Sequence, residues 1–303
     1  MIKKLVNLYH QKGPQGSLRK KMIYALSKTN HIVKEFIKHK FVYIFRRLLP
    51  NTITNDLYAF MGKYGITPYP YPFVFEYKNL PLDCTWDEQA SMFFILHENK
   101  RLYFPSSFTQ DYIIEYYKSL IIEQDERSPH QYIQNRERLR GKFLLDIGAA
   151  EGIFTLSHID IINHSFLFEC DDLWSKALNL TFAPWKDKIT IVSKYVSDKE
   201  DENNITIDLF LKDKEKKNLF LKMDIEGYEQ AALNGATNTL KEEKDIDYSI
   251  CVYHKKNDAV EINDFLLSFG FKSEYTDGYL YMCRELRKGI IRKANKEGSG
   301  STL

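Results

Sequence analysis

Residues 143–154, with the sequence FLLDIGAAEGIF, constrain the fold of this 303-residue chain more than any other segment. The first apolar residues predict a buried strand that ends in Asp146. A loop of small residues follows, and a helix is expected to begin near Ile153. In α/β proteins such a loop presents backbone N–H groups to a ligand at the carboxyl edge of the sheet. Gly148 allows a sharp turn in the loop. Gly152, which has no side chain, allows the helix that follows to lie close to its neighbours.

The spacing D-x-G-x-x-x-G indicates which ligand this loop binds. It is not the dinucleotide fingerprint G-x-G-x-x-G. The carboxylate of Asp146 stands where a pyrophosphate would be repelled and an ammonium group attracted. S-adenosylmethionine carries an ammonium group on its methionine moiety and has no phosphate. The alternative is an ordinary strand, turn and helix without a ligand.

The next two predicted strands supply candidates for the adenosine half of such a cofactor. SFLFECDD at 165–172 predicts a strand that ends in acids, and Glu169 lies 23 positions after the acid of the first strand. An acid at this spacing can accept hydrogen bonds from both ribose hydroxyls; otherwise it is a solvated strand-end acid. A third strand is predicted within 188–198, where Val196 and Ser197 either border the adenine or belong to a plain turn.

Acids also follow the fourth predicted strand, within NLFLKMDIEGYEQAAL at 218–233. Asp224, Glu226 and Glu229 lie around a glycine at the turn from strand to helix. Because an unpaired buried carboxylate is costly, we expect these acids to face the crevice at the strand ends.

A histidine ends the fifth predicted strand, in DYSICVYHKKND at 247–258. The pKa of histidine lies near the working pH of most enzymes, so His254 is a candidate general base. The alternative is a surface histidine at a strand end.

Residues 143–282 resemble a class I S-adenosylmethionine-dependent methyltransferase, and in particular the FkbM family. The motifs that carry the resemblance are DIGAAEG (146–152), FE (168–169), VSD (196–198), ITIDLFL (205–211), KMDIEGYE (222–229) and VYH (252–254). KMDIEGYE is the family-specific string.

The resemblance implies roles for individual residues. Cofactor contacts are expected from Asp146, Gly148, Ala149, Glu151, Gly152, Glu169 and Cys170. Cys170 departs from the family, whose members have asparagine or proline there. Asp224, Glu226 and His254 are expected beside the transferred methyl group, as catalytic residues.

We therefore expect an α/β fold of the Rossmann-like class I methyltransferase type, with a mostly parallel seven-stranded sheet preceded by a helical and β-hairpin cap. The expected parts are a basic helical region with the hairpin cap (1–127), a methyltransferase domain (128–290) and a flexible tail (291–303). A crossover helix is predicted in 205–213. The last two strands of the sheet are predicted within 269–282, joined by a turn at 276–278.

The region before the first strand shows three patterns. The proline-rich segment 68–81 predicts irregular chain that passes into a short strand, and 92–104 predicts a hairpin with its turn at 97–100. A helix is expected over 111–120.

The segment SPHQY at 128–132 has two interpretations. His130 and Tyr132 can cover the methionine end of the cofactor, as the approach to the first strand does in class I methyltransferases. Alternatively Ser128 caps a helix whose first residue is Pro129.

Composition is that expected of a folded enzyme of the cytoplasm. Hydrophobic residues make up 44% of the chain, and its mean hydropathy is −0.42. No apolar run reaches the roughly 20 residues of a membrane-spanning helix, and no signal-peptide core follows Met1. The four cysteines form no C-x-x-C pair, so neither a disulfide framework nor a zinc site is expected. The small polar ending, 298–303, is excluded from the folded part.

Positive charge is concentrated at the N-terminus. Residues 1–50 contain twelve Lys or Arg and one acid, Glu35, although the whole chain has a formal net charge of only +2. Helical spacing of apolar residues runs through 17–49 between these basic residues. Such a helix either lies on an anionic membrane surface or packs on its own catalytic domain. We favour packing, because its apolar surface is larger than soluble proteins usually expose. No nucleic-acid recognition module accompanies the charge, so a nucleic-acid partner is not expected.

Four functions are consistent with these patterns. The preferred one is O-methylation of a glycan, glycolipid precursor or secondary metabolite, so that the partner is a small-molecule or saccharide acceptor. His254, or with less preference Asp224, then takes the proton. A metal-assisted version would use Asp224, Glu226 and His254 to hold a magnesium-like ion. A non-catalytic scaffold is disfavoured because the acids are present, and a nicotinamide oxidoreductase because G-x-G-x-x-G is missing.

Overall fold

The computed structural model describes residues 34–35, 37–214 and 217–294. These fall into two units, divided after Pro70. The first unit contains helical residues at 34–35 and 37–45, the 3-10 helix η2 (Arg46–Leu48) and α3 (Ile53–Tyr64). The predicted helix over 17–49 is therefore present from 34 onward, and its earlier part lies outside the described residues.

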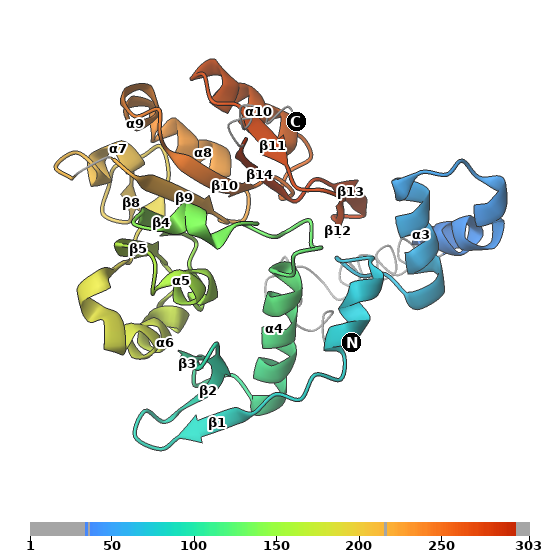
Figure 1. The fold of residues 1–303 in the computed structure, drawn as a ribbon, viewed down its shortest axis with the longest axis horizontal. Coiled ribbons are helices and arrows are strands. Elements are labelled where there is room, and N and C mark those ends of the chain that lie inside the picture. The colour runs from blue at the N-terminus through green and yellow to red at the C-terminus, as the bar shows by residue number, and fades with distance from the viewer. Residues whose placement is uncertain (1–33, 36, 215–216, 295–303) are drawn as a thin grey trace, which may run out of the picture. The chain divides into compact units, whose positions relative to one another are not determined.

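A seven-stranded sheet forms the centre of the second unit (Figure 1). Its strands, in spatial order, are β11 (Ser273–Tyr275), β14 (Ile290–Lys293), β10 (Asp247–Cys251), β9 (Leu219–Met223), β4 (Phe143–Ile147), β5 (His164–Phe168) and β6 (Ile189–Val192). β14 runs antiparallel to both of its neighbours, and the five strands from β10 to β6 are parallel. The predicted α/β class and mostly parallel sheet are confirmed.

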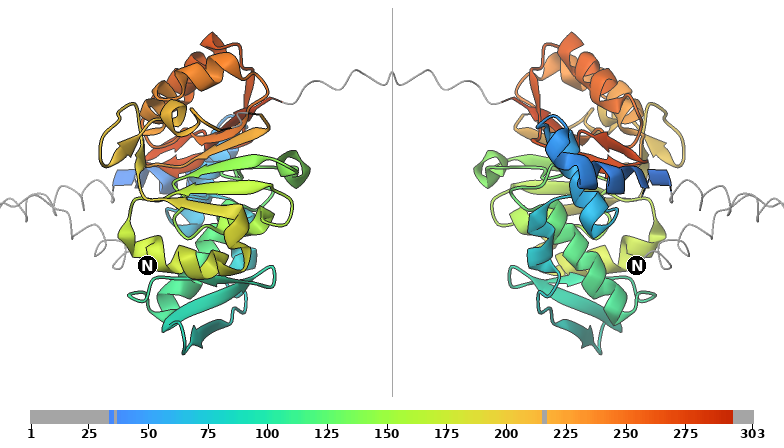
Figure 2. Two further views of the ribbon diagram at one scale, coloured as in Figure 1. Left: turned by 90° about the vertical axis from the view of Figure 1, so that its left-hand side faces the viewer. Right: turned by 90° about the vertical axis from the view of Figure 1, so that its right-hand side faces the viewer.

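Helices cover both faces of this sheet, as Figure 2 shows. One face packs against α7 (Ile207–Phe210), α8 (Glu229–Asn234), α9 (Thr237–Glu242) and α10 (Asp258–Ser268). The other packs against α4 (Gln110–Glu123), α5 (Ile153–His158) and α6 (Asp172–Phe182). Because both faces are covered, the central strand β9 is buried along its whole length and is apolar except for Lys222.

A three-stranded sheet, β1 (Cys84–Asp87), β2 (Met92–His97) and β3 (Lys100–Tyr103), precedes α4. The predicted hairpin and the helix after it are confirmed. The hairpin turn is made by Glu98 and Asn99, both with positive φ, as a two-residue turn between twisted strands requires.

The predicted boundary at residue 127 is wrong. Ile95 and Leu102 of the small sheet and Ile113 of α4 share one apolar core with α5 and α6. The hairpin cap is thus part of the same folded unit as the large sheet.

Three further expectations are corrected. The segment after Pro72 forms a 3-10 helix, η3 (Pro72–Tyr77), in place of a strand, with the proline at its first position. Residues 128–132 form turns and no helix, and the hydroxyl of Ser128 accepts the N–H of His130 locally. The predicted tail begins too early, because residues 291–293 belong to β14.

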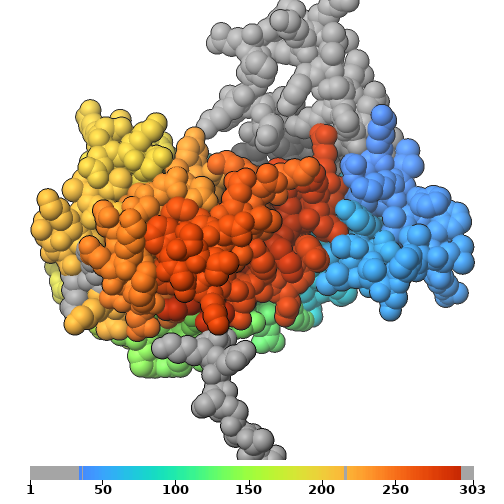
Figure 3. All heavy atoms as spheres, turned by 90° about the horizontal axis from the view of Figure 1, so that it is seen from above, coloured from blue at the N-terminus to red at the C-terminus, as the bar shows by residue number. Residues whose placement is uncertain are grey.

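The final strands are also arranged differently from the prediction. β11 pairs with β14, and between them β12 (Leu280–Met282) and β13 (Glu285–Arg287) form a separate hairpin. The C-terminal elements, orange and red, dominate the face of the second unit in Figure 3. The remaining short elements are η4 (Arg136–Leu139), η5 (Ala183–Lys188), β7 (Tyr195–Val196) and β8 (Asn204–Ile205). The described part of the chain has no helix that is both long and apolar enough to cross a membrane.

Candidate functional site

A cavity of about 240 Å³ lies where β4 and β9 end. Its wall combines three parts of the second unit: the glycine loop after β4, one side of α4, and the ends of β9 and β10. Residues that line the cavity include Tyr116, Tyr132, Gly148, Ala149, Glu151, Lys222, Asp224, Glu226 and Tyr253.

The glycine loop is held close to the end of β9. Gly148 has φ +79°, and a Cβ atom there would lie 2.0 Å from the carbonyl oxygen of Asp224. Gly152 has φ +82°, and a Cβ atom would lie 2.7 Å from the ring of Phe182 on α6. Both positions therefore require glycine, the first for backbone packing and the second for the close approach of α6 to the loop.

Asp146 is bound within the protein. It is fully buried, and its Oδ1 lies 3.0 Å from Nζ of Lys222, the residue paired with it across β4 and β9. The hydroxyl of Thr155 donates to its Oδ2 over 2.7 Å. Lys222 also donates to the carbonyl oxygen of Gly148 over 2.6 Å. The ammonium group that pairs with Asp146 in this structure is that of Lys222. Because Lys222 also binds the carbonyl oxygen of Gly148, Asp146 stabilises the glycine loop through this lysine.

Glu151 is the buried acid of the loop that faces the cavity. Its carboxylate accepts a hydrogen bond of 2.9 Å from the hydroxyl of Tyr116 on α4. Burial raises the pKa of Glu151 to about 7, although that hydrogen bond and the more distant charge of Lys222 oppose the shift. The site therefore holds a carboxyl group that would gain from a cationic ligand.

Glu169, directly after β5, stabilises the glycine loop through hydrogen bonds from backbone N–H groups. Its Oε2 accepts the N–H of Ala150 and its Oε1 that of Asp171, over 2.9 and 2.8 Å. The wall of the cavity, as formed by the described residues, does not include Glu169, Cys170, Val196 or Ser197. Their assignment to the adenosine half of the cofactor stays a prediction.

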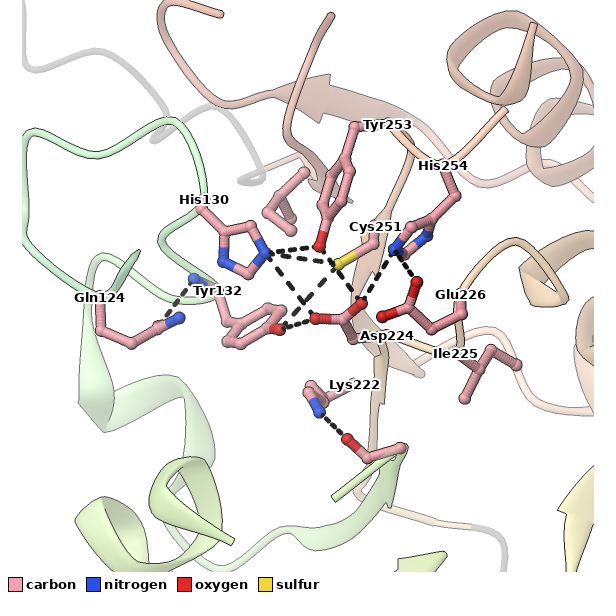
Figure 4. A network of polar contacts seen from close by, with 12 residues as sticks. Gln124, His130, Tyr132, Lys222, Asp224, Ile225, Glu226, Cys251, Tyr253 and His254 are labelled. Carbon is pink, nitrogen blue, oxygen red and sulfur yellow. Dashed lines mark hydrogen bonds and ion pairs between the residues drawn. The ribbon is translucent and has the colours of Figure 1, made fainter. Parts of the chain in front are cut away.

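Asp224, directly after β9, is the centre of a polar network (Figure 4). The hydroxyl of Tyr132 donates to its Oδ2 over 2.6 Å, and that of Tyr253 to its Oδ1 over 3.3 Å. Nε2 of His130 lies 3.7 Å from Oδ2. Burial alone would raise the pKa of Asp224, but the charges of His130 and Lys222 and the bond from Tyr132 lower it overall. Asp224 is thus held ionised at the cavity wall.

His254 lies beside this carboxylate, with a second acid behind it. Its Nε2 is 3.4 Å from Oδ1 of Asp224, and its Nδ1 is 2.8 Å from Oε1 of the buried Glu229. Burial lowers the pKa of His254, but the bond to Glu229 and the neighbouring carboxylates raise it overall. The arrangement is that of a base oriented by an acid on its other ring nitrogen.

Backbone contacts fix this pair further. Glu229 also accepts the N–H of Ile225 over 2.9 Å. Arg287 of β13 donates to the carbonyl oxygens of Tyr253 and His254, over 2.8 and 3.0 Å. The β12–β13 hairpin therefore helps to position the end of β10.

Glu226 occupies the turn between β9 and α8. It has φ +56° and an exposed side chain, whose Oε2 lies 3.9 Å from Nε2 of His254. A non-glycine residue with positive φ is uncommon, so the turn is strained where it presents this carboxylate.

Several of the predicted site residues lie together at the cavity, and the structure adds site residues that the sequence did not predict. Gly148, Ala149, Glu151, Tyr132, Asp224 and Glu226 border the cavity, and His130 and His254 contact Asp224. Roles for Lys222, Tyr253 and Tyr116 are absent from the sequence interpretation. Glu229 was expected to face the crevice, but it is buried behind His254 and does not line the cavity. The acid pattern of KMDIEGYE contained Glu229 as a signal, but only the structure pairs it with His254.

The fold is that of a class I methyltransferase, with the site at the carboxyl ends of its parallel strands. Residues 146–273 match the profile of the methyltransferase FkbM domain. The resemblance to the FkbM methyltransferases that the sequence predicts is confirmed over these residues, and with it the predicted cofactor, S-adenosylmethionine.

Solved structures of methyltransferases are similar to this chain in part. The FkbM methyltransferase of Methylobacillus flagellatus KT is 17% identical with a TM-score of 0.41, and the match covers 62% of this chain and 56% of that one. The N-terminal domain of human METTL16 in complex with SAH is 17% identical, with a TM-score of 0.37 and coverage of 59% and 70%. TrmK of M. capricolum, also with SAH, is 15% identical, with a TM-score of 0.37 and coverage of 53% and 66%. These scores are too low to carry an argument about function, and no curated protein matches the chain.

Proposed function

We propose that this protein is an S-adenosylmethionine-dependent O-methyltransferase whose acceptor is a hydroxyl of a glycan, a glycolipid precursor or a secondary metabolite. The observation that carries the proposal is the Glu229–His254 pair next to the ionised Asp224 at the cavity. When bound, S-adenosylmethionine supplies an electrophilic methyl group that an acceptor oxygen attacks in line.

The chain's own residues would handle the proton in this reaction. Nε2 of His254 takes the proton of the acceptor hydroxyl, and Glu229 stabilises the imidazolium through Nδ1. Asp224, held by two tyrosine hydroxyls, keeps a fixed negative charge beside that ring. The cavity walls supply alignment of the reactants, which can contribute about 7–11 kcal/mol to lowering the barrier.

The residues at the cavity fit the methionine end of the cofactor. Glu151 is a buried carboxylate that faces the cavity, and Lys222, a cation of the same lining, is bound by Asp146. A ligand ammonium group would balance the charge of Glu151. Gly148 and Ala149 would line the same end, while Glu169 is the proposed ribose partner.

The first test is calorimetric titration with S-adenosylhomocysteine, which requires no acceptor. Glu151→Gln should weaken binding about 10–100-fold, because a charge-assisted hydrogen bond contributes about 1.5–3 kcal/mol. Since the pKa of free Glu151 is about 7 and the ligand prefers the carboxylate, wild-type affinity should rise with pH and level off above that value. In Glu151→Gln this rise should disappear.

Glu115→Gln, on the exposed side of α4, is the matched control and should bind like wild type. Wild-type protein that does not bind the ligand would contradict the proposed function. A variant that keeps both the affinity and the pH dependence would remove only the assignment of Glu151. Turnover with a panel of neutral saccharides then tests the acceptor class.

A metal-assisted version of the reaction is supported by a second observation. Donor atoms of Asp224, Glu229 and His254 lie within 4.8 Å of one another, so Glu229, and not the predicted Glu226, completes this group; those of His130, Asp224 and Cys251 lie equally close. Hydrogen bonds already engage Asp224 and Glu229, which favours the metal-free version. Turnover that is lost with a chelator and restored by Mg²⁺ would reverse this preference.

A further inference from the structure

One face of the N-terminal helix carries a stripe of exposed apolar side chains. Ile37, Phe41, Ile44 and Leu48 follow one another at intervals of four, three and four residues, so they share a face of the helix that runs from 34 through η2. Their exposed fractions are 60, 55, 67 and 81%. Phe45, whose ring packs 4.4 Å from that of Phe41, extends the stripe. We call these five residues the apolar stripe.

The opposite side of the same helix is occupied by α3. His39 is fully buried and stacks on Tyr58 of α3, with their ring centroids 5.1 Å apart. The two helices approach so closely that a Cβ atom on Gly62 would lie 2.1 Å from the carbonyl oxygen of His39. Arg46 closes the turn between them through an ion pair with Asp56. This packing fixes the helix with its apolar stripe directed away from α3.

Positive charge surrounds the apolar stripe. Lys34, Lys38 and Arg47 are exposed on the same helix. The single acid of this helix is Glu35. Its Oε2 lies 3.8 Å from Nζ of Lys38 and 3.6 Å from Nε2 of His39, so little negative charge is left on this surface. The preceding sequence, residues 1–33, contains seven Lys or Arg and no acid. Anionic lipid headgroups complement such a combination of apolar and basic groups.

We infer that the helix of residues 34–48 binds the surface of an anionic membrane, with the apolar stripe in the headgroup region and the basic residues against lipid phosphates. Large contiguous apolar patches on soluble proteins mark interaction sites. The positive charge around the apolar stripe favours an anionic membrane over a second copy of this chain. A second copy would bring an equally basic surface, and the two surfaces would repel each other. This inference runs against the packing on the catalytic domain that the sequence favoured, and it is independent of the proposed methyl transfer.

The test is sedimentation of the full-length protein with vesicles. Ile37→Gln, Phe41→Gln and Ile44→Gln together remove most of the apolar stripe and leave the charge unchanged. Val260→Gln with Leu267→Gln, at two exposed apolar positions of α10, is the matched control. Wild type and control should sediment with phosphatidylglycerol vesicles at low salt, release at high salt, and ignore phosphatidylcholine vesicles. The stripe variant should bind at least about tenfold more weakly.

Each other outcome overturns the inference. Wild type that ignores anionic vesicles excludes the membrane. A stripe variant that sediments like wild type shows that the basic residues act without the helix face. A dimer without lipid, abolished in the stripe variant, means that a second copy covers the apolar stripe. A melting temperature far lower in the stripe variant than in the control means that the stripe is part of the core.

Discussion

Glu229 lies behind the ring of His254, outside the lining of the cavity, and its bond to Nδ1 contributes to raising the pKa of that histidine. Its carboxylate lies 2.8 Å from Nδ1, which leaves Nε2 directed at Asp224. A base held in this way has one defined tautomer and a stabilised charged form. Glu229→Gln should therefore change the chemistry of His254, while its amide oxygen can still accept the N–H of Ile225 beside the cavity wall.

Glu229→Gln should lower the pKa of His254, because the variant loses the hydrogen bond to a charged acid that raises it. His254 should then release its proton at lower pH than in wild type. Titration of the histidine ring protons by NMR measures this shift directly. Glu226→Gln, at an exposed acid 3.9 Å from Nε2, is the control and should have the smaller effect. Equal pKa values in wild type and Glu229→Gln would contradict the pairing.

The sequence identified individual site residues better than it identified the residues that contact them. The acids after β4 and β9 were identified because their spacing from the glycines is a local pattern. The partner of Asp146 was not, because Lys222 is 76 positions away and becomes its neighbour only through the register of β4 and β9. For the same reason an ammonium ligand was assigned to Asp146, while the structure directs Glu151 at the cavity.

Among the elements, the glycine loop depends on one close contact. The loop between β4 and α5 passes the end of β9 so tightly that Gly148 has no space for a side chain. Gly141 also has a positive φ, +69°, but a Cβ atom there would contact nothing within 4 Å. The two glycines thus separate the effect of backbone conformation from that of packing.

Gly148→Ala should destabilise the protein by about 2–4 kcal/mol and abolish binding of S-adenosylhomocysteine, because the new methyl group displaces the loop. Gly141→Ala should cost only about 1 kcal/mol and leave binding intact. Urea denaturation and calorimetry measure the two effects. Equal losses in the two variants would mean that strain, and not the contact with Asp224, requires glycine at 148.

Long apolar strands and helices of the second unit could be predicted, whereas its last strands could not. β4, β5 and β9 are continuous runs bounded by glycines and acids, which local patterns identify. β11 and β14 are three and four residues long, and their pairing encloses another hairpin. Nothing in so short a segment indicates which of several later strands will be its partner.

For the whole molecule, the division after Pro70 separates two roles. The large sheet, the glycine loop and the network around Asp224 all lie within 71–294, and the apolar stripe lies within 34–70. The catalytic and membrane-binding proposals therefore belong to different units.

A chain that starts at Tyr71 should fold, bind S-adenosylhomocysteine within a few-fold of the full-length affinity, and fail to sediment with anionic vesicles. All elements of the cofactor site are retained, and the apolar stripe and the basic segment are removed. Calorimetry measures the affinity for S-adenosylhomocysteine, and sedimentation with vesicles measures the loss of membrane binding. An aggregated or non-binding product would mean that residues 1–70 are needed to complete the catalytic unit.

The position of β14 has a consequence for how the protein is made. A ribosome delivers this strand after all others of the sheet, yet β14 lies between β10 and β11, and Arg287 just before it holds the carbonyl oxygen of His254. During synthesis, the edge of β10 therefore stays unpaired until β14 has been made, and His254 lacks its contact with Arg287 until then. A chain truncated before Arg287 should therefore expose the edge of β10 and leave the carbonyl oxygens of Tyr253 and His254 without the guanidinium that holds them.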